Sequence, residues 1–337
     1  MHPALGNRTF SVTMKKYQDI REHSLELTEV TRNFYGKLIG SFPPFDPREK
    51  VERLLQGAID THFHAGPHVY AVCRSEIEYG LRATEAGMQA IFDKGSTTPT
   101  ARSALLVQEI VNQWAKEHNK RPCRIMGGVV LCYQVGGLNV EAVRNAAQFG
   151  GKFVWMPPFD CSHHRRLMGT LAKLGHGIDV LDENDEVVQE LKDIFRVIAE
   201  FDMVLVCTHQ STKERLIMVD TARELGVKRI LLVHVFQPTT KLDIEQMKLF
   251  IDKGCYLEHC FFDLSPVAWP WEETLQAFRE IGTDRFVIAS DLGNWRKPDP
   301  IDMYKITIGL LLEYGISEAD VAKMVRLNAE KLIWGDP

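Results

Sequence analysis

The sequence of 337 residues predicts an α/β protein, a (β/α)8 TIM barrel with an N-terminal helical extension. The first observation behind this prediction is an alternation of short apolar runs with amphipathic stretches, which is typical of a parallel sheet whose strands are joined by helices. The second is that there are eight such runs, nearly continuous in apolar character, as expected for strands buried on both faces. A closed barrel is therefore favoured, and a doubly wound open sheet is the alternative.

The predicted strands are rich in β-branched residues, and the stretches between them have helical periodicity. In chain order the strands are 58–64, 89–94, 124–131, 152–156, 203–209, 229–235, 255–260 and 285–291. The predicted helices include SEIEYGLRATEAG, ARSALLVQEIVNQWAKEH, NVEAVRNAAQFG, NDEVVQELKDIFRVIAEF, TKERLIMVDTARELG, DIEQMKLFIDKG and EETLQAFREIG. Several of them start with Ser, Asn or Thr and end in Gly, as helix caps do.

The chain is expected to divide into an extension, residues 1–56, and a barrel, residues 57–337. KKYQDIREHSLELTEVTRNFYGKLIG has helical character, and SFPPFDP then breaks the chain. We expect this extension to pack against the barrel at a contact between subunits of a homo-oligomer. The segment 158–183 is the longest connection and a candidate active-site loop or lid.

Composition excludes several classes of protein. The net charge of −5 and the absence of a basic stripe do not predict a nucleic-acid partner. No apolar run reaches the ~18–20 residues that span a bilayer. The N-terminus lacks the pattern of a secretion signal, so the cytoplasm is the expected location. The seven cysteines show no CxxC spacing and are interpreted as buried apolar residues in a reducing compartment.

Titratable residues end six of the eight predicted strands, and in a parallel barrel these ends form one face where binding and catalytic groups collect. Because side chains alternate along a strand, two histidines spaced as HxH point to the same side, and Asp60 is expected to orient one of them. The strand-end residues are His62 and His64, Lys94, His209, His234, the pair Glu258-His259, and Asp291.

These residues together predict a metal site. One histidine at a strand end is more often a hydrogen-bonded structural residue than a ligand. Four histidines and an aspartate at one barrel mouth, however, would leave several neutral imidazoles close together without a partner, which is unfavourable. A divalent metal accepts imidazole nitrogen and carboxylate oxygen together. We therefore expect one or two divalent ions, with zinc favoured over iron or manganese.

The order of these motifs resembles the amidohydrolase superfamily, metal-dependent hydrolases on a distorted TIM barrel. The resembling features are HxH on the first strand, single histidines on the fifth and sixth, an aspartate on the eighth, and the ending NAEKLIWG. The segments GAIDTHFHAGP, GGVVLCYQVGGLN, KFVWMPPFD, YLEHC and ASDLG are more narrowly similar to the DUF6282 family, whose members are uncharacterised.

The resemblance implies roles for the predicted ligands. His62, His64 and Asp291 are expected to bind the more buried ion, and Asp291 also to accept the proton of the attacking water. His209 and His234 are expected to bind a second ion or to contact the substrate. The fourth strand offers neither of the bridging residues of binuclear members, a carboxylated lysine or a glutamate, so the number of ions stays open.

Further side chains have open roles. Glu258 can replace the missing carboxylate, and it is expected to face inward in preference to His259, because an outward carboxylate would meet apolar helix faces. Lys94 can be carboxylated, pair with Glu258, or polarise a substrate carbonyl. His68 and His164, on the loops after the first and fourth strands, are candidate substrate contacts.

The predicted function is a hydrolase that directs a metal-activated water at an amide, cyclic amide, lactone or ester of a small molecule. The alternatives are a metal-dependent decarboxylase and a non-haem (di)iron oxygenase on the same barrel. A non-enzymatic metal-binding protein would need the same ligands but no open coordination position. Metal analysis of the purified protein separates these interpretations.

Overall fold

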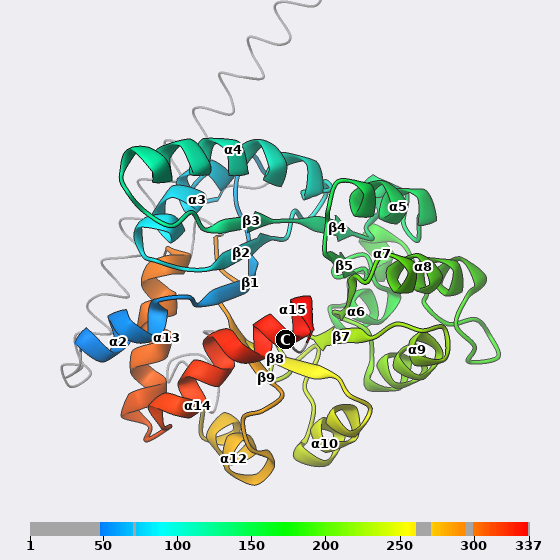
Figure 1. Ribbon diagram of the computed structural model, residues 1–337. Helices are drawn as coiled ribbons and strands as arrows, with labels where there is room; N and C mark the ends of the chain where they lie inside the picture. The colour runs from blue at the N-terminus through cyan, green and yellow to red at the C-terminus, as the bar shows by residue number, and fades with distance from the viewer. Residues whose placement is uncertain (1–47, 70–71, 261–270, 294–298, 336–337) are drawn as a thin grey trace, which may run out of the picture.

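A computed structural model describes residues 48–69, 72–260, 271–293 and 299–335 (Figure 1). The predicted N-terminal extension lies outside these ranges up to residue 47. Its last part is the helix α2 (Arg48–Leu55). The boundary between extension and barrel therefore stays a prediction.

All eight predicted strands are present and parallel, and they form a closed barrel. They are β1 (Ile59–Phe63), β2 (Ala90–Asp93), β3 (Arg124–Met126) with β4 (Gly128–Val130), β5 (Phe153–Trp155), β6 (Val204–Cys207), β7 (Arg229–Leu232), β8 (Tyr256–Cys260) and β9 (Phe286–Ala289). The pairing runs β1-β2-β3 and then β4 to β9 in chain order. The last strand returns to the first, where His64 N donates to Leu292 O at 2.8 Å.

The third predicted strand is divided because the start of a helix packs against it. Thr100, the residue before α4 (Ala101–Glu117), donates its N–H to Gly128 O, and its hydroxyl accepts from Gly128 N at 3.1 Å. A side chain at Gly127 would collide with the backbone of Thr100 at 2.5 Å. The glycines thus allow this close approach, and β3 and β4 are one strand with an interruption.

Helices surround the barrel (Figure 1). After α2 and α4 they are α3 (Glu76–Glu85), α5 (Val140–Gln148), α6 (Ser162–Leu167), α7 (Leu171–Leu174), α8 (Gln189–Glu200), α9 (Thr212–Glu224), α10 (Ile244–Asp252), α12 (Trp271–Ile281), α13 (Pro300–Glu313), α14 (Glu318–Ala322) and α15 (Asn328–Trp334), with short turns η1 (Tyr133–Val135) and η2 (Lys323–Leu327). In α3 and α9 a serine and a glutamate form a capping box. In the described part of the chain, none of the helices combines the length and apolarity of a membrane span.

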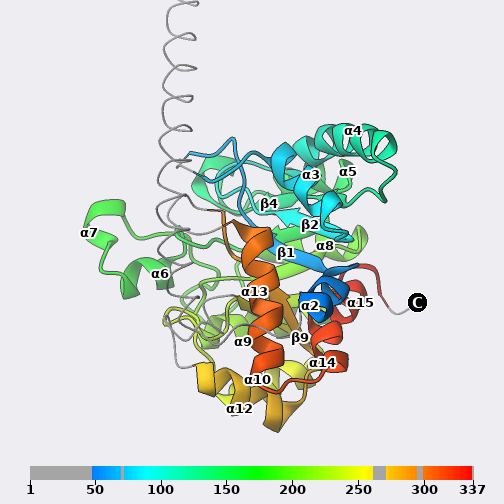
Figure 2. The same cartoon turned by 90° about the vertical axis from the view of Figure 1, so that its left-hand side faces the viewer.

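One predicted helix starts later than expected. The amphipathic stretch from residue 184 becomes helical only at Gln189, because Leu181 and Val187 pair in an antiparallel bridge before it. The preceding segment 158–183, predicted as a loop or lid, carries the short helices α6 and α7, which stand out from the barrel (Figure 2).

The two ends of the barrel differ in chemistry. Apolar side chains from the first residues of the strands, such as Phe153, Val204 and Tyr256, pack with Leu332 and Ile333 of α15. This helix crosses the barrel at that end (Figure 1). The N-terminal end is therefore an apolar floor, and the polar strand-end residues lie at the opposite, C-terminal end.

Candidate metal centre

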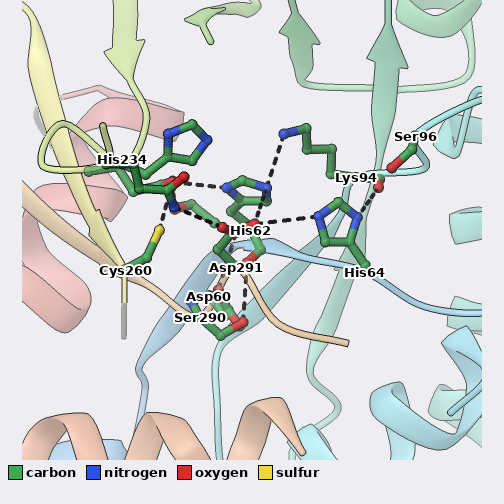
Figure 3. Close-up of polar contacts among 12 residues, drawn as sticks. Asp60, His62, His64, Lys94, Ser96, His234, Cys260, Ser290 and Asp291 are labelled. Atoms are coloured by element: carbon green, nitrogen blue, oxygen red, sulfur yellow. Dashed lines mark hydrogen bonds and ion pairs between the residues drawn. The ribbon is translucent and has the colours of Figure 1, made fainter. Parts of the chain in front are cut away.

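Three predicted ligands converge where the first and last strands meet (Figure 3). Nε2 of His62 lies 3.2 Å, and Nε2 of His64 3.5 Å, from Oδ1 of Asp291. Ligand atoms of the three residues lie within 4.8 Å of one another. Asp291 N donates to His62 O at 2.8 Å. The closure of the barrel therefore brings residues of its first and last strands together.

Each of these two imidazoles has a partner at its other nitrogen. Nδ1 of His62 lies 2.9 Å from Oε1 of Glu258, and Nδ1 of His64 lies 2.8 Å from the carbonyl oxygen of Lys94. A carbonyl can only accept, so Nδ1 of His64 donates. Nε2 of His62 lies 3.1 Å from the ammonium group of Lys94, which can only donate, so Nε2 accepts there and Nδ1 carries the proton of this ring as well. The lone pairs therefore lie on Nε2, on the side of Asp291.

This donor set fits a divalent cation. Two lone pairs and an anionic oxygen that face one another in a buried site need positive charge close to them. Lys94 Nζ lies 3.1 Å from one of the nitrogens, and a divalent ion would coordinate all three atoms. Imidazole nitrogen and carboxylate oxygen are ligands that zinc, iron and manganese accept. His62, His64 and Asp291 would hold the ion, and the partners at Nδ1 would orient both rings.

Burial keeps His64, His209 and His234 neutral. It lowers the pKa of His64 to about 4, and it lowers the pKa values of His209 and His234 well below the ordinary histidine value. A neutral imidazole keeps a lone pair for a metal ion at neutral pH.

Glu258 faces the site, and His259 faces away from it. The Glu258 carboxylate accepts from Thr61 Oγ1 at 3.0 Å and forms a group with His62 and Cys260, on the side of His62 opposite Asp291. Burial and the charge of Asp291 raise the pKa of Glu258 to about 8. The ring of His259 packs against those of Phe236, Phe278 and Phe286.

Asp60 does not orient an imidazole as expected. Its Oδ1 accepts from the backbone N–H groups of His62, at 3.2 Å, and Ser290, at 3.0 Å, so it links the first and last strands. The physical reason is a register shift between Asp60 and Phe63, after which Thr61 and His62 both reach Glu258. Strict alternation, on which the expectation depended, is broken there.

Lys94 enters the site at two points. Its backbone carbonyl accepts from His64, and its Nζ lies 3.1 Å from Nε2 of His62. The residue is buried. Lys94 therefore places a cation beside the candidate ligands.

The remaining histidines border this centre. Nδ1 of His209 lies 2.8 Å from Nδ1 of His164, and the ring centroids of His209 and His234 are 5.0 Å apart. Within the described ranges, neither His209 nor His234 belongs to a group close enough to share one ion. His68 lies further out, where its Nε2 accepts from Ser96 N at 3.3 Å.

Sequence reasoning missed three contacts of the centre. Nε2 of Gln237 donates to Oδ2 of Asp291 at 3.3 Å, Thr240 contacts His234, and Thr61 contacts Glu258. Gln237 and Thr240 follow a strand-end histidine, and polar residues on such loops could have been flagged. Thr61 gave no signal, because alternation places it on the other face from His62.

Two site residues have unusual backbone angles. His234 has φ 37° and Asp291 φ 48°, in the left-handed region that non-glycine residues seldom adopt. Both stand just after a strand, where the chain turns out of the barrel. Such conformations persist where the surrounding structure holds them, and they concentrate at functional sites.

Solved structures share this fold. The probable dipeptidase PvdM of Pseudomonas aeruginosa matches 86% of this chain and 98% of its own, with 12% identity and a TM-score of 0.54. A mutant PTE-like lactonase of Deinococcus radiodurans matches 84% and 97%, with 14% identity and a TM-score of 0.52. A D-hydantoinase matches 84% and 72%, with 11% identity and a TM-score of 0.51.

At these identities the likeness establishes the fold alone, and it confirms the predicted TIM barrel. No curated protein sequence matches the chain. The model of a family of unknown function, DUF6282, matches residues 57–258, more than half of the chain. The strand ends of the metal centre up to Glu258 fall within the matched region. The chain therefore belongs to the DUF6282 family.

Proposed function

We propose that this protein is a metal-dependent hydrolase of small molecules. The observation that carries the proposal is the convergence of His62 Nε2, His64 Nε2 and Asp291 Oδ1 at the C-terminal end of the barrel. Proteins with the same fold are named as a dipeptidase, a lactonase and a D-hydantoinase, which supports an amide, cyclic amide or lactone as the bond that is cleaved.

The residues have separate tasks in this proposal. His62 and His64 hold one divalent ion, zinc in the first place and iron or manganese otherwise. The bound ion supplies Lewis acidity and lowers the pKa of water. Gln237 donates to Oδ2 of Asp291 and so keeps Oδ1 turned toward the imidazoles. Asp291 takes the proton of the attacking water and passes it to the leaving group.

Other side chains at the mouth act on the substrate. Lys94 Nζ, next to His62, donates to the oxyanion that forms at the substrate carbonyl. His209 and His234, with His164 and His68 further out, contact the rest of the substrate. Glu258 is assigned to orienting His62, because it contacts Nδ1 of that ring.

The test combines metal analysis with Asp291→Asn. We expect the purified protein to contain about one divalent ion per chain and to hydrolyse members of a panel of dipeptides, lactones and hydantoins. Asp291→Asn should lower turnover by about 10²- to 10⁴-fold. Asp252→Asn, an exposed change on α10, is the matched control and should leave turnover unchanged.

Other outcomes favour the alternative reactions. Release of CO2 from carboxylic acids without net uptake of water indicates a decarboxylase. Two irons with an oxygen-dependent colour change indicate an oxygenase. Full turnover of Asp291→Asn, or protein that binds no divalent ion, contradicts the proposed function.

A further inference from the structure

The inference concerns how His234 is held, which the proposed function leaves unexplained. His234 follows β7, has a left-handed backbone conformation, and is 2% exposed. Its ring centroid lies 6.0 Å from that of His62 and 5.0 Å from that of His209. A ring in this place contributes either a lone pair or an N–H to the site, and which of the two depends on its tautomer.

The hydroxyl of Thr240 decides the tautomer. Thr240 Oγ1 lies 2.7 Å from the carbonyl oxygen of His234 and 3.2 Å from Nδ1 of the same residue. A hydroxyl has one proton, and the carbonyl, which can only accept, is the nearer partner. Thr240 therefore donates to His234 O and accepts from His234 Nδ1–H, so the lone pair of the ring lies on Nε2.

Arg215 in turn holds Thr240. Its Nη2 donates to the carbonyl oxygen of Thr240 at 2.9 Å, and the residue is 1% exposed. Among the described residues, Nε and Nη1 of Arg215 have no hydrogen-bond partner. Nη2 also lies 3.5 Å from Thr212 Oγ1, so the shorter contact with Thr240 is the main polar attachment of this side chain.

We propose that Thr240 and Arg215 are positioning residues, which hold His234 as the Nδ1–H tautomer with its Nε2 lone pair available to the site. Thr240 acts directly on the ring, and Arg215 acts through Thr240. The tautomer follows from the contacts alone, and only its effect on turnover rests on the proposed function.

The first test is nuclear magnetic resonance of metal-free protein labelled with ¹⁵N in histidine, where long-range ¹H–¹⁵N spectra distinguish the two tautomers. The signal of His234 is assigned from its loss in His234→Asn. We expect the Nδ1–H form in the wild type, a mixture or the Nε2–H form in Thr240→Val, and the wild-type form in Thr240→Ser. Thr307→Val is the matched control, because this equally buried threonine donates to Met303 O inside α13.

The second test measures coupling and turnover. Arg215→Met should shift the tautomer in the same direction as Thr240→Val, and the double variant should be no worse than the poorer single one. Thr240→Val should lower kcat/KM by about 10- to 100-fold, and Thr240→Ser should restore it.

An Nε2–H tautomer in the wild type, or an unchanged tautomer in folded Thr240→Val, overturns the proposal whatever the reaction is. If Thr240→Val does not fold, the tautomer in wild type, Thr240→Ser and Arg215→Met decides in the same way. A shifted tautomer in a protein without hydrolase activity contradicts the proposed function and leaves the positioning intact.

Discussion

The histidines around Asp291 show how burial and a fixed partner define the chemistry of a side chain. His62, His64 and His234 each contact an oxygen through Nδ1: that of a carboxyl, a carbonyl and a hydroxyl group. These contacts leave the Nε2 lone pairs for the site, and burial disfavours the protonated rings of His64 and His234. The residue type alone predicted a ligand, whereas the partner at Nδ1 shows which nitrogen has its lone pair free to bind an ion.

Asp60 allows a prediction of pH dependence. Burial raises its pKa from the ordinary 3.8 to about 7, so the folded protein binds a proton between these values that the unfolded chain has lost. The free energy of unfolding should therefore fall as the pH rises from about 4 to about 7, by up to about 4 kcal/mol from this group. Above pH 7 the contribution should be constant.

The measurement is urea unfolding of the wild type and Asp60→Asn at several pH values. An asparagine oxygen can accept the same two backbone N–H groups but does not titrate. The free energy of unfolding of Asp60→Asn should therefore fall less with rising pH than that of the wild type. If the free energy of unfolding falls equally in both proteins between pH 4 and 7, the raised pKa does not belong to Asp60.

At the scale of the element, the metal centre depends on the junction between β9 and β1. The chain after β9 forms a bridge between Leu292 and Phe63, and Gly293 O accepts from Cys73 N. A Cβ at Gly293, which has φ +121°, would lie 1.8 Å from His64 O. This glycine thus allows the backbone after β9 to lie close to His64, a candidate metal ligand.

Gly293→Ala should destabilise the protein and weaken metal binding, because the collision moves either His64 or the segment that carries Asp291. Calorimetric titration with Zn²⁺ and urea unfolding check the two effects. Gly282→Ala is the control, because Gly282 has φ +85° with open space around it. If both variants bind Zn²⁺ as the wild type does, the junction is not what holds the ligands.

For the whole molecule, the two ends of the barrel have separate tasks. The floor made by α15 buries apolar side chains against the start of the strands, and the site occupies the other end. The apolar floor and the candidate site are thereby built from different residues, as is usual in TIM barrels.

Leu332→Ala, in the floor, should lower the free energy of unfolding by about 2–5 kcal/mol, because it leaves a cavity in a packed core. Turnover of the folded variant should stay within about twofold of the wild type, since the change lies far from the reacting groups along the barrel axis. Denaturant unfolding and steady-state kinetics check both. Leu327→Ala, at a position 37% exposed, is the control and should lower the free energy of unfolding much less.

The sequence alone was sufficient to predict the barrel and the strand ends at which the candidate site lies. Eight apolar runs alternating with capped helices leave few other arrangements, and parallel strands bring their C-terminal ends to one face. The candidate ligands His62, His64 and Asp291 followed from that, because position at a strand end is a local property that can be read along the chain.

Only the tertiary structure decided which side chains meet and by which atom. The register shift after Asp60 gives His62 the partner Glu258 in place of the expected Asp60, and Thr61 also donates to Glu258. The roles of Gln237 and Thr240 arise from a loop folding back on the site. A shift of one residue changes the face of every following side chain, and loop contacts depend on packing between segments far apart in sequence. Such information lies in the closed barrel and not in any local pattern.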